Sequence, residues 1–254
     1  TGSALAMSGS ASVLSIAGNF TNNGSFSSAG LVNLNGTSAQ TLSGVTTFQN
    51  LTINNGTGIL LNSNINISAV LTLQNGIVNT QGNTLTLTSF SLGAMVRSGN
   101  SHVSGTLQRA IAPGSNTYEF AVGDAGAYTP VSISVNNVTV SGSISAVTTG
   151  ADHPQIASSG LDAQKSVNRT YSLSNSGVTL THYNATFTFV AGDLDPAVTT
   201  SSLLTGLYGA AWTYPTIGTR TATTIQVQSV NTFGQFAIAE CKSPTAYNVT
   251  GGGL

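Results

Sequence analysis

The sequence predicts an all-β fold, in which a short right-handed parallel β-solenoid (a β-helix) is followed by a β-sandwich. Three observations predict it: a strand-like phrase recurs through the N-terminal part, charged residues are absent before position 97, and short alternating runs follow position 107. The chain has 254 residues, of which 40% are hydrophobic. It is therefore long enough to bury the core of one large all-β domain or of two smaller ones.

The recurring phrase is a triplet in which two apolar residues flank one polar residue. It reads LSI, VNL, LTI, LTL and LTL, and its last residue stands at positions 16, 34, 53, 73 and 87. In a strand this alternation turns the flanking residues inward and the middle residue outward. The first three spacings, of 18, 19 and 20 residues, suit one turn of a coil whose turns stack about 4.8 Å apart.

The outward residues of the phrase are expected to form a column along the coil. Its members are Ser15, Asn33, Thr52, Thr72 and Thr86, and the last four are a possible contact ladder. Because like charges stacked at this separation repel each other, the stacking itself explains why residues 1–96 carry no charge. A regular Thr array also suits an ice-binding surface, but this is a lesser alternative, since Thr is an ordinary choice on an outward strand face.

Asn-Gly pairs separate the phrases and are expected to form the corners of the coil. The pairs begin at Asn23, Asn35, Asn55 and Asn75. Both residue types accept a positive φ, which corners require. Asn-Gly is also the strongest short hairpin signal, so an antiparallel meander is the rival interpretation. The recurrence of one phrase every 18 to 20 residues favours the solenoid.

The second half of the chain is predicted to form an Ig-like β-sandwich over residues 107–243. Alternating runs such as TYEFAV, VSISV and ATFTFV are separated by Gly, Asn and Pro turns, as in folds built from many short strands. The solenoid is assigned to residues 1–106, and the junction at 97–117 is expected to cover the open end of the coil. Residues 244–254 are predicted to be a linker or the start of a following module.

The segment from Arg109 to Asp124 carries a specific resemblance. It contains the pattern R-x-I-x-x-G-S-x-x-Y-x-F-x-V-G-D after the repetitive N-terminal part. In this the chain resembles the secreted, repetitive cell-surface proteins of Bacteroidetes and related bacteria, and the resemblance covers most of the chain. It implies a β-helical stretch followed by a sandwich module, in an extracellular product that is often anchored at the cell surface or secreted by a type IX system, with adhesive or structural roles.

The balance of charge excludes several classes of partner. The net charge is -1 and only 5% of residues are charged, so the surface cannot release counterions from phosphates and we expect no nucleic-acid partner. No apolar stretch approaches 18 residues, so we expect no membrane insertion. Cys241 is the only cysteine, which excludes an internal disulfide and a cysteine zinc site, and we expect its thiol to be buried and unpaired.

Residues that could perform catalysis are few, and we expect no enzymatic activity, no cofactor and no metal. The chain has three His and no G-x-S-x-G elbow. A polysaccharide-active enzyme is a lesser alternative, but residues 1–96 lack the base and carboxylates that such a coil needs. Asp193 and Asp195 could supply oxygens to Ca²⁺, but no further carboxylates surround them in the sequence, so a loop turn is preferred.

Two aromatic residues could form a platform for sugars. Trp212 and Tyr214 lie close together in AWTYP, although burial of Trp212 in the core is the preferred interpretation. Three arginines are expected to form ion pairs at the domain junction instead of holding a ligand. The arginines are Arg109, Arg169 and Arg220, and their possible partners are Glu119, Asp124 and Asp162.

These observations predict a non-catalytic, extracellular structural or adhesive module of a bacterial surface protein. Open strand edges at the ends of the coil and of the second half favour end-to-end assembly into a filament or surface layer. The expected partners are further copies, neighbouring modules of the same surface protein, and glycans. A carbohydrate-binding adhesin is the main alternative, and an ice-binding protein and a polysaccharide-active enzyme are lesser ones.

Overall fold

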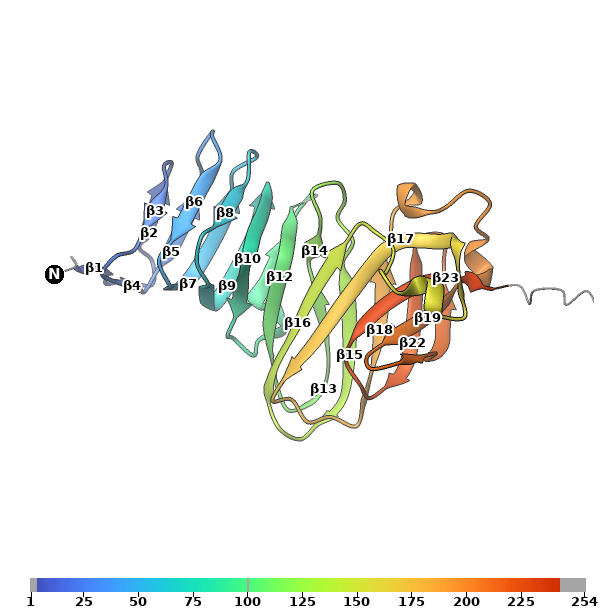
Figure 1. The fold of residues 1–254 in the computed structure, drawn as a ribbon. Coiled ribbons are helices and arrows are strands. Elements are labelled where there is room, and N and C mark those ends of the chain that lie inside the picture. The colour runs from blue at the N-terminus through green and yellow to red at the C-terminus, as the bar shows by residue number, and fades with distance from the viewer. Residues whose placement is uncertain (1–3, 100, 243–254) are drawn as a thin grey trace, which may run out of the picture.

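The fold is all-β, with 62% of the residues in strands, and its N-terminal part is a β-solenoid of about six turns (Figure 1). The computed structural model describes residues 4–99 and 101–242. Successive turns pair in parallel from β2 through β5, β7 and β9, so the predicted parallel solenoid is confirmed and the antiparallel meander is wrong. The segment 244–254, predicted as a linker or further module, lies outside the described residues.

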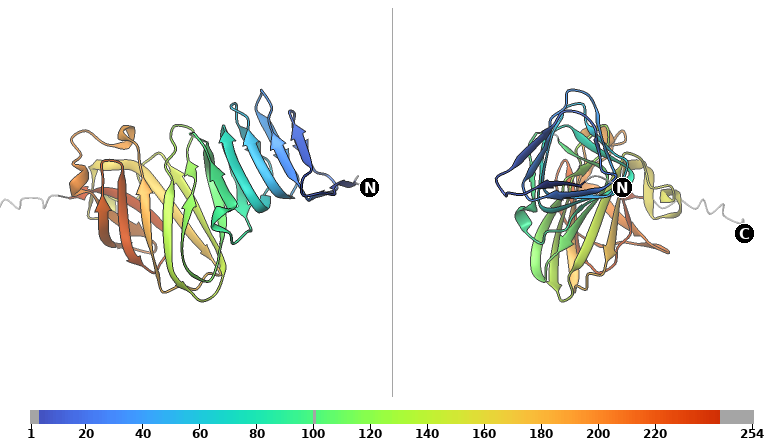
Figure 2. Two further views of the ribbon diagram at one scale, coloured as in Figure 1. Left: turned by 180° about the vertical axis from the view of Figure 1, so that it is seen from behind. Right: turned by 90° about the vertical axis from the view of Figure 1, so that its left-hand side faces the viewer.

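Each full turn of the solenoid runs through three strand segments, which build three faces of the coil (Figure 2). Face 1 contains β2 (Val13–Ile16), β5 (Leu31–Leu34), the second halves of β7 (Thr46–Asn54) and β9 (Ile65–Asn75), and β11 (Met95–Arg97). Face 2 contains the first halves of β7 and β9 and the second halves of β10 (Ile77–Leu87) and β12 (His102–Ile111). It is preceded by the paired strands β1 (Ala4–Met7) and β4 (Ser25–Ser28). Face 3 contains β3 (Phe20–Thr21), β6 (Gln40–Ser43), β8 (Ile59–Leu61), the first halves of β10 and β12, and β14 (Val122–Gly123).

The apolar residues of the repeated phrase form stacks inside the coil. Val32 pairs with Leu51, which pairs with Leu71, and these three side chains are buried. A parallel stack of Leu34, Ile53 and Leu73 runs two residues further along each strand. Each such side chain removes from water an area worth roughly 1.5–3 kcal/mol. The alternation in the sequence therefore specifies the interior of the coil directly.

A polar cluster holds one corner of the coil together. The side-chain carbonyl of Gln40 accepts hydrogen bonds from the Gly36 backbone N–H and the Asn55 side-chain amide, both at 2.9 Å. Its own amide donates to the Ile16 carbonyl at 2.9 Å, so three turns are connected. Among the four Asn-Gly pairs, a positive φ is found at Gly76 alone, where φ is +91°. The expected positive φ is therefore absent from three of the pairs, and other glycines of the coil adopt it instead, at Gly44, Gly58 and Gly82.

Strand β12 joins the solenoid to the second half of the chain, and it spans the predicted boundary at 106/107. It pairs in parallel with β10 on one side and antiparallel with β16 (Gly142–Thr149) on the other. The sheet then continues antiparallel through β17 (Leu161–Ser176), β23 (Gln235–Cys241), β19 (Leu204–Tyr208) and β20 (Trp212–Thr213). One sheet therefore runs from the coil into the C-terminal half without a break (Figure 1).

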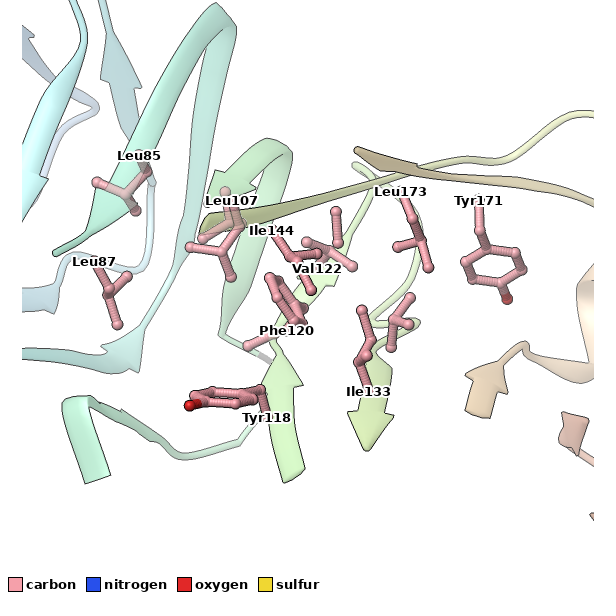
Figure 3. Close-up of a cluster of buried hydrophobic side chains, with 14 of the residues drawn as sticks. Leu85, Leu87, Leu107, Tyr118, Phe120, Val122, Ile133, Ile144, Tyr171 and Leu173 are labelled. Carbon is pink, nitrogen blue, oxygen red and sulfur yellow. The ribbon is translucent and has the colours of Figure 1, made fainter. Parts of the chain in front are cut away.

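A second, five-stranded antiparallel sheet faces this extended sheet. Its strand order is β13 (Gly114–Phe120), β15 (Val131–Val138), β18 (His182–Thr188), β22 (Thr224–Val230) and β21 (Thr216–Arg220). The short 3-10 helices are η1 (Leu92–Ala94), η2 (Ile156–Ser158), η3 (Ala191–Asp193) and η4 (Thr200–Ser202). The ring of Phe187 lies 4.7 Å from those of both Tyr171 and Phe236 on the other sheet. Figure 3 shows that the buried cluster continues from the coil, at Leu85, into the space between the sheets.

Candidate functional site

Three residues of the predicted contact ladder lie together on face 1. Asn33 pairs with Thr52, and Thr52 pairs with Thr72, in direct register on successive turns. Ser15 precedes Asn33 in the same column. The three side chains are half-buried, and the Asn33 side-chain oxygen has no hydrogen-bond partner among the described residues. The ladder is therefore a column of neutral polar residues on successive turns of face 1.

Thr86 does not belong to this column, so its predicted stacking on Thr72 is wrong. The neighbour of Thr72 on the next turn is Val96 in β11, which is 50% exposed. Thr86 lies on face 2, where it pairs with Asn66 on one side and Gln108 on the other. The physical reason is the short final spacing of 14 residues, because that length carries the chain from face 1 only as far as face 2.

Charges introduced into the ladder should interact according to this register. We expect the double substitution Thr52→Asp/Thr72→Asp to be about 1 kcal/mol less stable than Thr52→Asp/Thr72→Lys, because the two positions are directly opposed. The pair Thr52→Asp/Thr86→Asp is the control, and its effects should be additive since the residues lie on different faces. Urea denaturation of the single and double variants measures the coupling. Equal coupling in both Asp pairs would contradict the register.

The proposed sugar platform lies at the end of the extended sheet. Trp212 is half-buried, packs edge-on against His153 at 4.9 Å and donates its indole N–H to the Ser158 hydroxyl at 3.2 Å. Tyr214 is 52% exposed, and its hydroxyl accepts the Gly160 backbone N–H at 2.5 Å. Both polar groups therefore have partners within the protein. Trp212 packs against the small cluster around Leu161 but is only half-buried, so its expected burial in the core is met only in part.

A buried ion network lies at the junction of the coil and the sheets. Arg169 is 2% exposed, and its Nε and Nη2 donate to the two carboxylate oxygens of Asp193 at 2.8 Å each. Its Nη1 donates to Asp124 at 2.9 Å and to the Thr148 hydroxyl at 3.3 Å. Burial lowers the pKa of Arg169, but the hydrogen bonds that it donates to both carboxylates outweigh this effect, and the pKa is raised. The bidentate geometry makes this the strongest charged contact among the described residues.

The expected arginine pairs are therefore confirmed only for Arg169 and Asp124. The guanidinium of Arg109 donates to the backbone carbonyl of Glu119 instead of its carboxylate, and Arg220 donates to the Leu203 carbonyl. The main partner of Arg169, Asp193, was predicted only as part of a turn. That turn is present as η3, and the two Asp of GDLDP were the signal that could have identified the ion pair.

Next to this network, two carboxylates share one hydroxyl group. The Ser166 hydroxyl donates to Asp152 at 2.6 Å and lies 3.0 Å from a carboxylate oxygen of Asp195. One hydroxyl proton cannot serve both acceptors. Burial raises the pKa of Asp152, and the nearby Asp195 carboxylate adds to this against the Ser166 hydrogen bond. Burial also acts to raise the pKa of Asp195, but hydrogen bonds from Ser166 and Asn168 outweigh it, so that pKa is lowered.

The pKa of Asp152 is raised and that of Asp195 is lowered, so the substitutions Asp152→Asn and Asp195→Asn should change the stability with opposite dependences on pH. Because the pKa of Asp195 is lowered, its contribution to stability is present above about pH 4 and is lost as the pH falls further. Asp195→Asn should therefore destabilise the protein at pH 7, and the loss should shrink toward pH 3. Because the pKa of Asp152 is raised, its neutral form is favoured, so Asp152→Asn should gain stability relative to the native protein as the pH rises. Denaturation at pH 3, 5 and 7 measures both. The same trend for both variants would contradict the assignment.

His153 is held by hydrogen bonds inside the protein, whereas Cys241 lies at the surface. His153 is buried, its Nδ1 accepts the Gln155 backbone N–H at 3.1 Å, and its Nε2 therefore donates to the Gln235 side chain at 2.6 Å. Cys241 is exposed, so its predicted burial is wrong, because it stands at the last position of β23. In the described part of the chain, no group of three or more His, Cys, Asp or Glu could hold a metal ion.

No protein-family model, no curated protein and no solved structure matches this chain. Within residues 4–99 and 101–242, no helix is both long enough and apolar enough to cross a membrane.

Proposed function

We propose that the protein is a non-catalytic, extracellular structural or adhesive module of a bacterial surface protein, whose copies associate end to end into a filament or surface layer. The observation that carries the proposal is the apolar surface exposed on the first described turn of a solenoid that has no charged residue before Arg97. In this function the stacked turns act as a stiff spacer. The partners are other copies or neighbouring modules of the same surface protein, and glycans are further ligands.

The continuity of the fold supports a load-bearing role. The parallel ladders of the coil connect through β12 to the antiparallel sheet, so backbone hydrogen bonds extend over both halves. Side chains follow the same path, because Thr86 donates to the Gln108 side chain at 3.3 Å and Gln108 donates to Ser145 at 3.2 Å. A force applied along the molecule would therefore be carried by many bonds in parallel.

The N-terminal end of the coil supports association. Leu5 is 53% exposed, and Phe20 and Phe26 are only half-buried, whereas the interior positions of later turns are buried. These three residues line a recess at the first turn. Apolar surface and unpaired strand edges of this kind favour pairing with another chain. The absence of charge over residues 1–96 removes the repulsion that would oppose contact between identical copies.

Negative-stain electron microscopy and sedimentation at rising protein concentration test the assembly. We expect chains of particles for the native protein and a block of assembly for Leu5→Asp, which places a charge on this exposed apolar surface. Val45→Asp is the matched control, because Val45 is 70% exposed but lies on a loop between β6 and β7. Isolated monomers at high concentration, or equal assembly of Leu5→Asp and the native protein, would overturn the proposal.

We further propose that the two sheets of the C-terminal half act as one Ig-like β-sandwich over residues 107–243, and that the coil is right-handed. The support for the sandwich is the shared core, in which Phe187 of one sheet packs between Tyr171 and Phe236 of the other. Buried residues alternate with partly exposed ones along most of β15 and all of β18, which fits a sheet with one covered face. Limited proteolysis tests the sandwich as a separate unit. Release of a folded fragment that begins just before β12 would support it, and loss of folded material on any cleavage there would contradict it.

A further inference from the structure

The sixth turn of the solenoid leaves a gap on face 1. Strand β12 supplies faces 3 and 2 of that turn, after which the chain enters β13. Among the described residues, β11 pairs only with β9, and β13 is an edge strand of the second sheet. A recess of about 440 Å³ lies between them, within the range of roughly 300–1,000 Å³ that is usual for small-molecule sites.

A buried cation without a carboxylate partner borders this recess. Arg109 is 2% exposed, and its guanidinium donates only to backbone carbonyls, of Glu119 at 2.7 Å, Leu92 at 3.2 Å and Ser91 at 3.4 Å. Its Nε–H has no acceptor, and no carboxylate lies within 4.0 Å of it in the described part of the chain. Its guanidinium also lies 5.4 Å from the centroid of the Tyr118 ring. No negatively charged group contacts this buried cation among the described residues, so an anion in the recess would be favoured.

The other residues that line the recess provide hydroxyl groups and apolar atoms, which suit an acidic sugar better than a small inorganic anion. Arg97 adds a second cation, and its guanidinium lies 3.9 Å above the Tyr128 ring. Glu119 is the one carboxylate of the lining, and it accepts the Tyr128 hydroxyl at 2.6 Å. Hydroxyl groups of Thr117 and Ser132 and apolar atoms of two further residues complete the wall. The two apolar residues are Leu92 and Met95.

We propose that this recess binds the carboxylate of a hexuronate unit in an acidic saccharide. The carboxylate lies toward Arg109 and Arg97, the sugar hydroxyls reach Thr117, Ser132 and Glu119, and the ring carbons contact Leu92 and Met95. Charge-assisted bonds to the arginines distinguish the acid from a neutral sugar of the same shape. This binding function goes beyond the structural role, and either one can fail without the other.

Calorimetric titration of the native protein with sodium D-galacturonate tests the site, with D-galactose as the neutral match. We expect binding of the uronate alone, and about tenfold weaker binding for Arg97→Gln, which removes one charge-assisted contact. Arg220→Gln is the matched control, because Arg220 lies at the opposite edge of the second sheet, and it should leave the affinity unchanged. Thermal unfolding of each variant verifies that the fold persists.

Four results would overturn the assignment. These are absence of galacturonate binding, equal binding of galactose, an unchanged affinity in Arg97→Gln, and tighter binding of an acidic peptide than of the uronate. The last result would assign the recess to a peptide, since β11 and β13 both offer strand edges there. None of these results affects the assembly measured by electron microscopy.

Discussion

Replacing Arg169 by Leu is expected to lower the free energy of unfolding by about 3–5 kcal/mol. The substitution leaves the Asp193 carboxylate, which is only 8% exposed, without its bidentate partner, and it also removes the contact to Asp124. The cost arises mainly from the unpaired buried charge and less from the lost attraction. Chemical denaturation at pH 7 measures the loss.

Two further variants identify the cause. Adding Asp193→Asn to the Arg169→Leu background should recover part of the stability, because the neutral amide can still accept the Val190 backbone N–H that Asp193 accepts at 3.0 Å. Lys165→Met is the surface control, since the Lys165–Glu240 pair is 3.4 Å long and the lysine side chain is 45% exposed. It should change stability by at most about 1 kcal/mol. A similar small change for Arg169→Leu would show that the buried network contributes little.

Gly76→Ala is expected to be the most damaging small substitution in the solenoid. Gly76 has a φ of +91°, and an added Cβ would lie 1.8 Å from the backbone oxygen of Asn55 on the preceding turn. The positive φ costs roughly 1–2 kcal/mol for a residue with a side chain, and the overlap adds about 1–3 kcal/mol because the neighbouring backbone must move. Thermal and urea denaturation measure the total.

Gly82→Ala separates the two causes. Gly82 has nearly the same φ, +84°, but no atom lies within 4 Å of the position of an added Cβ. This variant should therefore show only the backbone cost of roughly 1–2 kcal/mol. Equal losses for the two substitutions would mean that the turns of the coil do not lie as closely on each other as the register requires.

The coil could be predicted from the sequence because every turn makes the same local demand. A strand that covers a narrow interior needs apolar residues at alternate positions. Every turn has this requirement, so the same apolar-polar-apolar triplet recurs in the sequence, and its residues Leu51, Leu71 and Leu85 are all buried. Alternation specifies the inside and the outside of a strand, but it is the same on every face. This is why Thr72 and Thr86 looked equivalent although they lie on different faces.

The candidate sites could be predicted much less well. The sequence shows that Arg109 and Arg169 are rare charges in a neutral chain, and it suggested carboxylate partners for both. The sequence does not show that Arg169 and Asp193 lie close together in space, because they are 24 residues apart in the chain. They meet only because β17 and η3 lie side by side in the fold. The recess beside Arg109 depends on a strand that is missing from the sixth turn, and a missing strand leaves no pattern in the sequence.

The sequence by itself thus determined the all-β class, the parallel stacking of the turns and the neutral surface of the coil, because each depends on contacts between residues one turn apart. Only the tertiary structure decided which face each strand joins, that β12 is shared by two kinds of sheet, and which arginine is paired. Those features depend on where the repeating turns of the solenoid end and the antiparallel sheets begin. Beyond that point the partners of a residue are set by long-range packing, which local alternation does not encode.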